Sequence, residues 1–155
     1  MSTLIFGGGG FVGLAIAEQL LARGEAVTLA DRTRPPEGAL QALATLRGKL
    51  GIVIGDVRDG AFVASAFDTK PARVVWGAAI TADAARDAAD PEGVLAINLA
   101  ALVPVLRQAR DRDVKRVVNL SSVAAIGDAA YVPGLDEIGE DTPCDPIGLY
   151  SLTKF

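Results

Sequence analysis

Short apolar runs alternate along this chain with stretches in which apolar residues recur at helical spacing. Residues 3–6 form an apolar run that ends in four glycines, and Val12, Ile16 and Leu20 then recur at intervals of four. The change from a continuous run to an i, i+4 stripe predicts a strand, a tight turn and a helix. A second β-prone run follows at residues 26–30. The N-terminal segment therefore predicts one βαβ unit.

The same alternation continues towards the C-terminus. The predicted strands are residues 51–54, 73–76 and 116–120, and the predicted helices are residues 38–46, 59–67, 91–111 and one that begins near Ile147. Pro104 predicts a kink or a local break in the long helix. Nearly continuous apolar strands are typical of a parallel sheet covered on both faces. The fold class is therefore α/β, with a doubly wound parallel sheet.

The domain organisation suggests a single unit that is incomplete. No linker interrupts residues 1–128, so we expect one domain there. A loop rich in turn residues follows, marked by Gly127, Pro133, Gly134, Pro143 and Pro146. Only a turn or two of the last predicted helix precedes Phe155, too little to bury an apolar face. We therefore expect residues 1–155 to be part of a longer protein.

Composition and charge remove several classes of function. Half of the 155 residues are hydrophobic and 22% are charged, which is typical of a packed globular domain rather than a disordered chain. The net charge is −4 and no block of Lys or Arg occurs, so we expect neither nucleic acid nor an anionic membrane surface as a partner. No basic leader precedes the first apolar run, and no stretch reaches the roughly 20 apolar residues of a membrane span.

The usage of cysteine and histidine narrows the chemistry further. Cys144 is the only cysteine and histidine is absent, which excludes an internal disulfide, a cysteine-based zinc site and a Ser-His-Asp triad within these residues. We expect no metal, and a reducing cytoplasm is the simplest location. No cation neighbours Cys144 in the sequence, so we interpret it as unreactive.

The glycine run between the first strand and helix is the strongest candidate for a ligand site. Gly7, Gly10 and Gly13 fit a GxxGxxG spacing, and Gly8 with the last two fits GxGxxG, so the run does not select a subfamily. Glycine permits a sharp turn with positive φ, lets the backbone approach a pyrophosphate and directs a helix N-terminus at the phosphates. A glycine turn without a ligand is the alternative, but this placement favours dinucleotide binding.

An acidic residue at the end of the second strand bears on the choice of cofactor. Asp31 lies 18 residues after Gly13, close to the spacing of the acid that binds the adenosine ribose. Its charge would repel a 2′-phosphate, which favours NAD over NADP. Arg32 and Arg34 lie beside it and offer charges for such a phosphate, although a solvated loop is the interpretation that we favour for them. Asp31 itself has the alternative of a solvated turn acid.

Candidate catalytic residues lie near the C-terminus. Tyr150 and Lys154 are four apart on a predicted helix, which places them on one face, and an adjacent ammonium stabilises the phenolate that proton abstraction from an alcohol requires. Ser121 and Ser122 follow the fifth strand, so they are expected at the sheet edge where ligands bind. Chance surface pairing is the alternative for the first two, and an ordinary cap is the alternative for the serines.

Several segments in the same order resemble the extended short-chain dehydrogenase/reductase family, in its NAD-dependent epimerase/dehydratase group. These segments are LIFGGGGFVG, DR, GDVRD, VVWGAAIT, INLAAL, NLSSVAAIG and EDTPCDPIGLYSLTK. The resemblance implies a Rossmann domain with a smaller C-terminal substrate domain that is absent from this sequence. Two departures occur: Trp76 stands where many members have His, and Ile126 where they have Tyr. We interpret Trp76 as a packed core aromatic.

The resemblance also implies roles for individual residues. The expected cofactor contacts are Gly7, Gly10, Phe11, Val12 and Gly13 at the pyrophosphate, Asp31 and Arg32 at the adenosine ribose, Asp56 and Val57 at the adenine, Gly77, Ala78 and Ala79 beside the cofactor, and Asn98 near the nicotinamide. Ser122 becomes the catalytic hydroxyl and Tyr150 the acid/base. Lys154 binds the nicotinamide ribose and stabilises the phenolate.

These expectations define a function and two alternatives. The expected function is NAD-dependent hydride transfer between nicotinamide and a hydroxyl or carbonyl of a small molecule, with nucleotide sugars the commonest substrates of the group. A non-catalytic dinucleotide-binding regulator or scaffold on the same fold is one alternative, and an inactive fragment is the other. From the resemblance we also expect a homodimer, formed through the helix at residues 91–111 and the helix near Ile147.

Overall fold

The computed structural model describes residues 1–81, 84–127 and 137–155. Pro133 and Gly134 of the expected loop lie outside these residues. The chain forms two compact units. Unit 1 combines Met1–Ala78 with Ala101–Asn119, and unit 2 combines Ala79–Ala100 with Leu120–Phe155.

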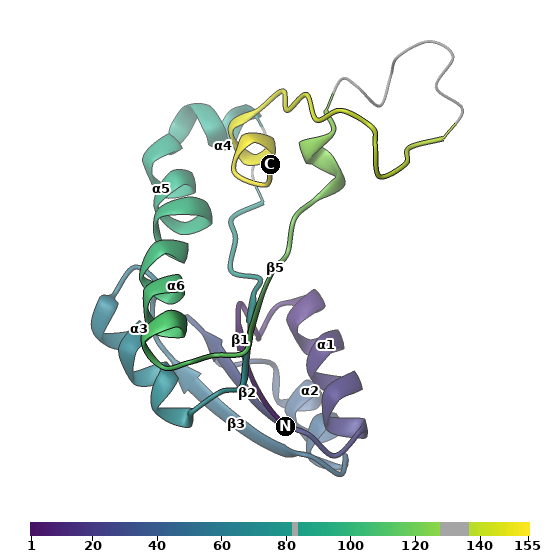
Figure 1. Cartoon of the computed structure of the whole chain (residues 1–155), viewed down its shortest axis with the longest axis vertical. Coiled ribbons are helices and arrows are strands. Elements are labelled where there is room, and N and C mark those ends of the chain that lie inside the picture. Colours follow the sequence, from purple (N-terminus) through teal and green to yellow (C-terminus); the bar gives the residue numbers. More distant parts are fainter. Residues whose placement is uncertain (82–83, 128–136) are drawn as a thin grey trace. The chain divides into compact units, whose positions relative to one another are not determined.

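Unit 1 contains a five-stranded parallel sheet (Figure 1). Its strands are β1 (Ser2–Phe6), β2 (Ala26–Asp31), β3 (Lys49–Ile54), β4 (Arg73–Trp76) and β5 (Arg116–Asn119). Their order is β3-β2-β1-β4-β5, and every pair is parallel. The chain first adds strands on one side of β1 and then returns to add β4 and β5 on the other side. The doubly wound, Rossmann-like sheet predicted from the apolar runs is confirmed.

Helices cover both faces of this sheet (Figure 1). The helices α1 (Phe11–Ala22) and α2 (Glu37–Ala44) lie on one face, and α3 (Gly60–Ala66), the short η1 (Phe67–Thr69) and α6 (Leu102–Asp111) lie on the other. The central strands β1 and β4 bury consecutive residues, as Leu4, Ile5 and Phe6 of β1 show with no exposed surface, whereas the edge strands β3 and β5 contain no buried residue. Burial on both faces explains why the strands are continuously apolar rather than alternating.

The end of β4 packs into an aromatic cluster. Trp76 is fully buried and pairs in register with Phe6 of β1, with their ring centroids 5.7 Å apart. Phe62 and Phe67 complete the cluster at 6.5 and 6.1 Å from the Phe6 ring. Each such pair contributes about 0.5–1.5 kcal/mol beyond the burial of its area. Trp76 therefore packs in the core, as the sequence suggested.

Unit 2 is built from short helical segments. They are α4 (Ala84–Ala89), α5 (Pro91–Leu95), the π-helical turn η2 (Ala96–Ala100), η3 (Val123–Ala125) and α7 (Leu149–Leu152). The Asp90 side chain accepts a hydrogen bond from Gly93 N at 3.0 Å, so α5 begins with a cap followed by Pro91 at its first position. Sequence analysis missed α4 and η3, which are too short to show a period.

The long helix predicted over residues 91–111, with a kink or local break at Pro104, is interrupted in the structure. The run divides into α5, the π-turn η2 and α6. Pro104 is the third residue of α6, where its missing N–H costs little because a first-turn N–H has no partner within the helix. The irregularity that Pro104 predicted therefore lies just before it, in η2.

The same run corrects the expectation that no segment is long and apolar enough to span a membrane. Pro91–Asp111 is 21 residues long with a mean hydropathy of 1.2, so it passes a test of length and composition. A helix that packs on a protein core passes the same test. Val105 and Ala109 of α6 are buried within unit 1, where α6 lies against α3.

Candidate functional site

The glycine turn in unit 1 is shaped by backbone atoms that leave no room for side chains. Gly7 follows β1 with φ +74°, and a Cβ there would lie 2.7 Å from Ala78 N at the end of β4. A Cβ on Gly8 would lie 2.8 Å from Ile5 O, and one on Gly13 would lie 2.5 Å from Gly7 O. The turn therefore packs tightly where β1 and β4 lie side by side. The strand order reverses between β1 and β4, and open parallel sheets bind ligands at such a switch point.

Gly10 differs from the glycines around it. A Cβ there would meet only Gly7 O, at 3.4 Å, which is an ordinary contact. Gly10 is the N-cap of α1 and has no side chain to accept a hydrogen bond from the first N–H groups of the helix, which include those of Phe11 and Val12. Both residues are exposed. An open backbone facing uncapped helical N–H groups fits a pyrophosphate, so the residues present suit a dinucleotide.

Asp31 lies beside this turn at the end of β2. Its Oδ2 accepts a hydrogen bond from Gly9 N at 2.9 Å, and Oδ1 has a long contact of 3.4 Å with Thr33 N. The glycine turn therefore holds one carboxylate oxygen, and the other has only this weak partner among the described residues. Arg32 is exposed in the following loop.

Asp56, which follows β3, is held by Arg58. The Arg58 Nε donates to both carboxylate oxygens at 3.0 and 3.1 Å, and Arg58 N donates to Oδ1 at 2.9 Å. These side-chain and backbone hydrogen bonds, helped by the charge of Arg32, lower the pKa of Asp56 to about 2. Asp56 therefore stays ionised over the physiological range. Val57 beside it is buried.

The remaining predicted cofactor residues divide between the two units. Gly77 and Ala78 leave β4 in unit 1, and Gly77 N donates to Phe6 O at 2.9 Å. Ala79 and Asn98 belong to unit 2, together with Ser122, Tyr150 and Lys154. The predicted site residues thus form two separate groups, one for the nucleotide turn and one for the catalytic side chains.

Tyr150 and Lys154 come together in unit 2. Tyr150 lies in α7, and the Lys154 Nζ is 5.9 Å from the centroid of its ring. Lys154 is only 6% exposed, and its Nζ donates to Leu120 O at 3.1 Å. Burial lowers the pKa of the Lys154 ammonium. The buried Lys154 ammonium therefore lies over the face of the Tyr150 ring.

The two serines after β5 have different partners. Ser121 Oγ donates to the main-chain oxygen of Lys154 at 2.5 Å. Ser122 Oγ accepts from Ala124 N at 3.2 Å and caps η3. The cap interpretation of Ser122 is therefore present in the structure, while its hydroxyl hydrogen remains available to another acceptor. The Ser121 hydroxyl, in contrast, uses its hydrogen in the bond to the Lys154 backbone.

Asn98 is the buried centre of unit 2, with 3% of its surface exposed. Its Oδ1 accepts from Ile80 N at 2.7 Å, and its Nδ2 donates to Ile80 O at 3.0 Å and to Thr153 Oγ1 at 3.1 Å. Sequence reasoning found Asn98 through the family resemblance but missed Thr153. A threonine next to the lysine carries no signal of its own, because its partner is 55 residues away.

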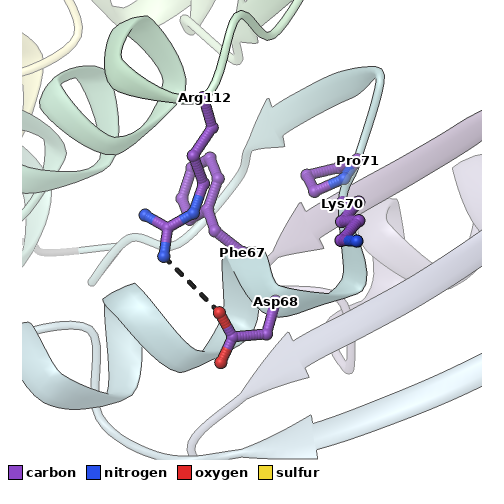
Figure 2. Close-up of a pocket in the computed structure, with 5 residues that line it drawn as sticks. All are labelled: Phe67, Asp68, Lys70, Pro71 and Arg112. Atoms are coloured by element: carbon purple, nitrogen blue, oxygen red, sulfur yellow. Dashed lines mark hydrogen bonds and ion pairs between the residues drawn. The ribbon is translucent and has the colours of Figure 1, made fainter.

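A pocket of about 460 Å³ lies elsewhere in unit 1 (Figure 2). Its residues are Phe67, Asp68, Lys70, Pro71 and Arg112. Arg112 reaches Asp68 at 3.5 Å and lies 5.8 Å from the Phe67 ring centroid, so these contacts link α6 to η1. Pro71 precedes β4, which places the pocket at the N-terminal end of the strands, opposite to the glycine turn. Figure 2 shows Arg112 directed at Asp68, and the two side chains are 37% and 75% exposed.

Metal chemistry has no site in the part of the chain that the structure describes. No group of three or more His, Cys, Asp or Glu side chains gathers there in a way that would hold a metal ion. Cys144 is exposed and unpaired by any disulfide.

A parallel sheet of this order, with a glycine turn at its switch point, defines a dinucleotide-binding protein of the Rossmann class. Sequence comparison is more particular: residues 3–155 match the NAD dependent epimerase/dehydratase family, and the chain belongs to that family. The resemblance found in the sequence motifs is confirmed.

Characterised relatives are similar over almost the whole chain. A dTDP-glucose 4,6-dehydratase from Mycolicibacterium smegmatis is 30% identical over 99% of this chain and 46% of its own length. A D-erythronate dehydrogenase from Cupriavidus necator is 32% identical over 99% of this chain and 47% of its own length. The chain therefore spans about half the length of the curated relatives that it matches.

Solved structures give the same result. A UDP-glucose 4-epimerase from Thermus thermophilus in complex with NAD is 30% identical, with a TM-score of 0.80 over 99% of this chain and 47% of that one. The Bifidobacterium longum UDP-glucose 4-epimerase in complex with NAD+ and UDP is 25% identical, with a TM-score of 0.86 over 99% of this chain and 46% of that one. These NAD complexes, with the family's own description, support NAD as the cofactor.

Proposed function

We propose that this chain is the dinucleotide-binding part of an NAD-dependent oxidoreductase of the epimerase/dehydratase type, acting on a nucleotide sugar or a similar small hydroxy compound. The observation that carries the proposal is the buried Lys154 ammonium beside the Tyr150 ring. A structural lysine gains little from burial, which lowers its pKa and costs solvation. Beside a phenol, the same charge favours proton abstraction.

Residues of unit 1 would hold the cofactor. The N–H groups of Phe11 and Val12 face the open side of the turn at Gly10, which suits a pyrophosphate. Asp31 Oδ1 has only a weak hydrogen-bond partner among the described residues, so it suits hydrogen bonds from the two ribose hydroxyls. The charge of this carboxylate disfavours a 2′-phosphate. Asp56 and Val57 would flank the adenine, with Gly77 and Ala78 alongside. Arg32 adds charge to the same edge.

Residues of unit 2 would handle the substrate proton. Tyr150 takes the proton of a substrate hydroxyl, and the Lys154 charge stabilises the phenolate that accepts it. The Ser122 hydroxyl donates a hydrogen bond to the same substrate oxygen as it becomes a carbonyl. When bound, NAD supplies the acceptor for the hydride that leaves the substrate carbon. Asn98 and Ala79 would lie near the nicotinamide.

Binding and turnover with matched variants test the proposal. The protein is titrated with NAD by calorimetry and then assayed with UDP-glucose, dTDP-glucose and D-erythronate, following NADH absorbance and the sugar products by NMR. We expect turnover of at least one compound, and Tyr150→Phe lowers it by about 100-fold or more because general acid–base catalysis contributes that much. NAD binding by Tyr150→Phe is expected to stay within about twofold, a change of about 0.4 kcal/mol.

Two outcomes would contradict the proposal. Absence of NAD binding would remove the dinucleotide site. NAD binding by the wild type without turnover of any compound would favour a non-catalytic dinucleotide-binding protein or an inactive fragment, and the intact mass of the purified protein separates these two.

We also propose a homodimer formed through the helical run that includes α5, η2 and α6. Leu95 and Leu99 in unit 2 are 39% and 53% exposed, and Val103 and Leu106 in unit 1 are each 45% exposed, so the part of this run in each unit carries exposed apolar side chains. The Ile147 side chain is also exposed, at 67%. Light scattering of the wild type is expected to give twice the monomer mass and of Leu99→Asp the monomer mass. A monomeric wild type at high concentration would contradict the dimer.

A cytoplasmic location remains a prediction.

A further inference from the structure

Tyr150 lies on a short helix whose position depends on contacts from other segments. The helix α7 has four residues, which is too short to be stable without outside contacts. Four described hydrogen bonds reach the helix or the residues directly after it from elsewhere in unit 2. Asp87 Oδ2 accepts from Leu149 N at 3.0 Å, Lys154 Nζ donates to Leu120 O, Ser121 Oγ donates to the Lys154 carbonyl, and Asn98 Nδ2 donates to Thr153 Oγ1. The orientation of Tyr150 therefore depends on side chains that are distant in sequence.

Only the last of these described contacts continues to the peptide of Tyr150 itself. Thr153 Oγ1 accepts from Asn98 at 3.1 Å and donates its own hydrogen to Tyr150 O at 2.7 Å. One hydroxyl thus joins the buried amide of Asn98 to the carbonyl of the candidate acid/base. Both N–H donors of Asn98 are used, so its amide cannot rotate without losing a bond.

The placement of Asn98 strengthens this link. Asn98 lies in the π-turn η2, an unusual helical geometry that is frequent at functional sites. It also makes two hydrogen bonds to the backbone of Ile80, on the segment that follows β4 in sequence. Three stretches of unit 2 therefore meet at one amide, and Thr153 is the residue through which α7 joins them.

We infer that Thr153 is a positioning residue for Tyr150: its hydroxyl is held by the Asn98 amide and in turn holds the peptide of Tyr150 through a second hydrogen bond. The inference rests on the function proposed above. The positioning of Tyr150 is assigned to the Thr153 hydroxyl, because the methyl group of Thr153 makes neither hydrogen bond. Valine has nearly the shape of threonine without the hydroxyl, and serine keeps the hydroxyl without the methyl, so the two substitutions separate these contributions.

The test compares Thr153→Val and Thr153→Ser with the wild type in the assay that detects wild-type turnover. For Thr153→Val we expect kcat to fall about tenfold, equivalent to about 1.4 kcal/mol, while the KM for NAD changes less than about twofold. Thr153→Ser is expected to keep kcat within about threefold. If Thr153→Val unfolds at the assay temperature, Thr153→Ala removes the hydroxyl without a new methyl group beside Asn98.

A second readout follows the hydrogen bond itself. The carbonyl ¹³C resonance of Tyr150 is expected to shift in Thr153→Val and in Asn98→Ala, and to keep its wild-type position in Thr153→Ser. Wild-type kcat in Thr153→Val, or equal loss in Thr153→Ser and Thr153→Val, would overturn the inference alone. Bound NAD without wild-type turnover would overturn the proposed function, and this inference with it.

Discussion

The two units hold their candidate site residues by different means. In unit 1 the glycine turn is fixed by backbone atoms in close approach, with would-be Cβ atoms at Gly7 and Gly13 within 2.7 Å of other backbone. In unit 2 the catalytic candidates are held by side-chain hydrogen bonds from Asn98 and Ser121, over 55 and 33 residues of sequence. The first arrangement leaves no room for a side chain at Gly7 or Gly13, and the second depends on a few polar groups.

The proposed function would account for this difference. A pyrophosphate is large and fully charged, so it needs open backbone N–H groups rather than particular side chains. Proton transfer needs one phenol and one ammonium in fixed positions, and short helices do not fix side chains alone. Unit 2 therefore surrounds Tyr150 and Lys154 with buried polar contacts.

The largest effect is expected for Gly13→Ala in unit 1. Its Cβ would lie 2.5 Å from Gly7 O and 2.7 Å from Gly8 Cα, and neither backbone atom can move without opening the turn. We expect a loss of about 3 kcal/mol of unfolding free energy, measured by urea unfolding. A value within about 0.5 kcal/mol of the wild type would show that backbone packing does not fix this turn.

Asn98→Leu applies the corresponding test to unit 2. The leucine fills a similar volume but leaves the Ile80 N–H and C=O without their partners. We expect a loss of about 2 kcal/mol in urea unfolding, with faster amide exchange at Ile80. Unchanged exchange at Ile80 would mean that the Asn98 hydrogen bonds do not hold unit 2.

Asp56 gives unit 1 a dependence on acid pH. Its pKa of about 2 in the folded protein lies below its ordinary value of 3.8, so the stability that it contributes is present above about pH 4 and is lost as the pH falls towards 2. Both partners are partly exposed, so we expect only about 1 kcal/mol. Urea unfolding of Arg58→Ala should differ from the wild type at pH 6 and converge with it near pH 2. A constant difference across this range would refute the assignment.

Lys154 gives unit 2 a dependence of the same sign, visible as a slope at alkaline rather than acid pH. Burial lowers its pKa in the folded protein below the unfolded value of 10.5. The unfolded chain therefore binds more protons between the two values, and this contribution to stability rises with pH through that window. The unfolding free energy of the wild type minus that of Lys154→Met should increase as the pH approaches 10.5. A flat difference would contradict the burial of this cation.

The smallest effect is expected at a glycine that neither unit's site uses. Gly38 lies in α2 with ordinary φ and no atom within 4 Å of a Cβ built there. Gly38→Ala should raise the unfolding free energy by about 0.5 kcal/mol, because alanine loses less backbone entropy in a helix. Destabilisation in urea unfolding would show that glycine is needed outside the turn as well.

The sequence was most informative about unit 1. Apolar runs and glycine spacing are local signals, so they predicted the five strands and the turn at Gly7 to Gly13 before any contact was known. Sequence spacing left two glycine fingerprints open, and the structure shows tight packing at Gly7, Gly8 and Gly13 with an open Gly10. Only the folded backbone distinguishes these roles.

Unit 2 was harder to predict because its order comes from distant contacts. The helices α4 and α7 have six and four residues, too few for a periodic pattern. The bond from Ser121 to Lys154 and the link between Asn98 and Thr153 join segments that no local pattern relates. Motif resemblance predicted the candidate catalytic residues, but not the side chains that contact them.

The central claim is that the turn at Gly10 stays open because a dinucleotide approaches it there. Calorimetric titration of NAD into the wild type, Gly10→Ala and Gly38→Ala tests this most directly, since an added Cβ at Gly10 makes one ordinary contact with the protein. We expect Gly10→Ala to unfold at nearly the wild-type temperature but to bind NAD at least about tenfold more weakly, while Gly38→Ala binds normally. Wild-type affinity in Gly10→Ala would contradict the claim.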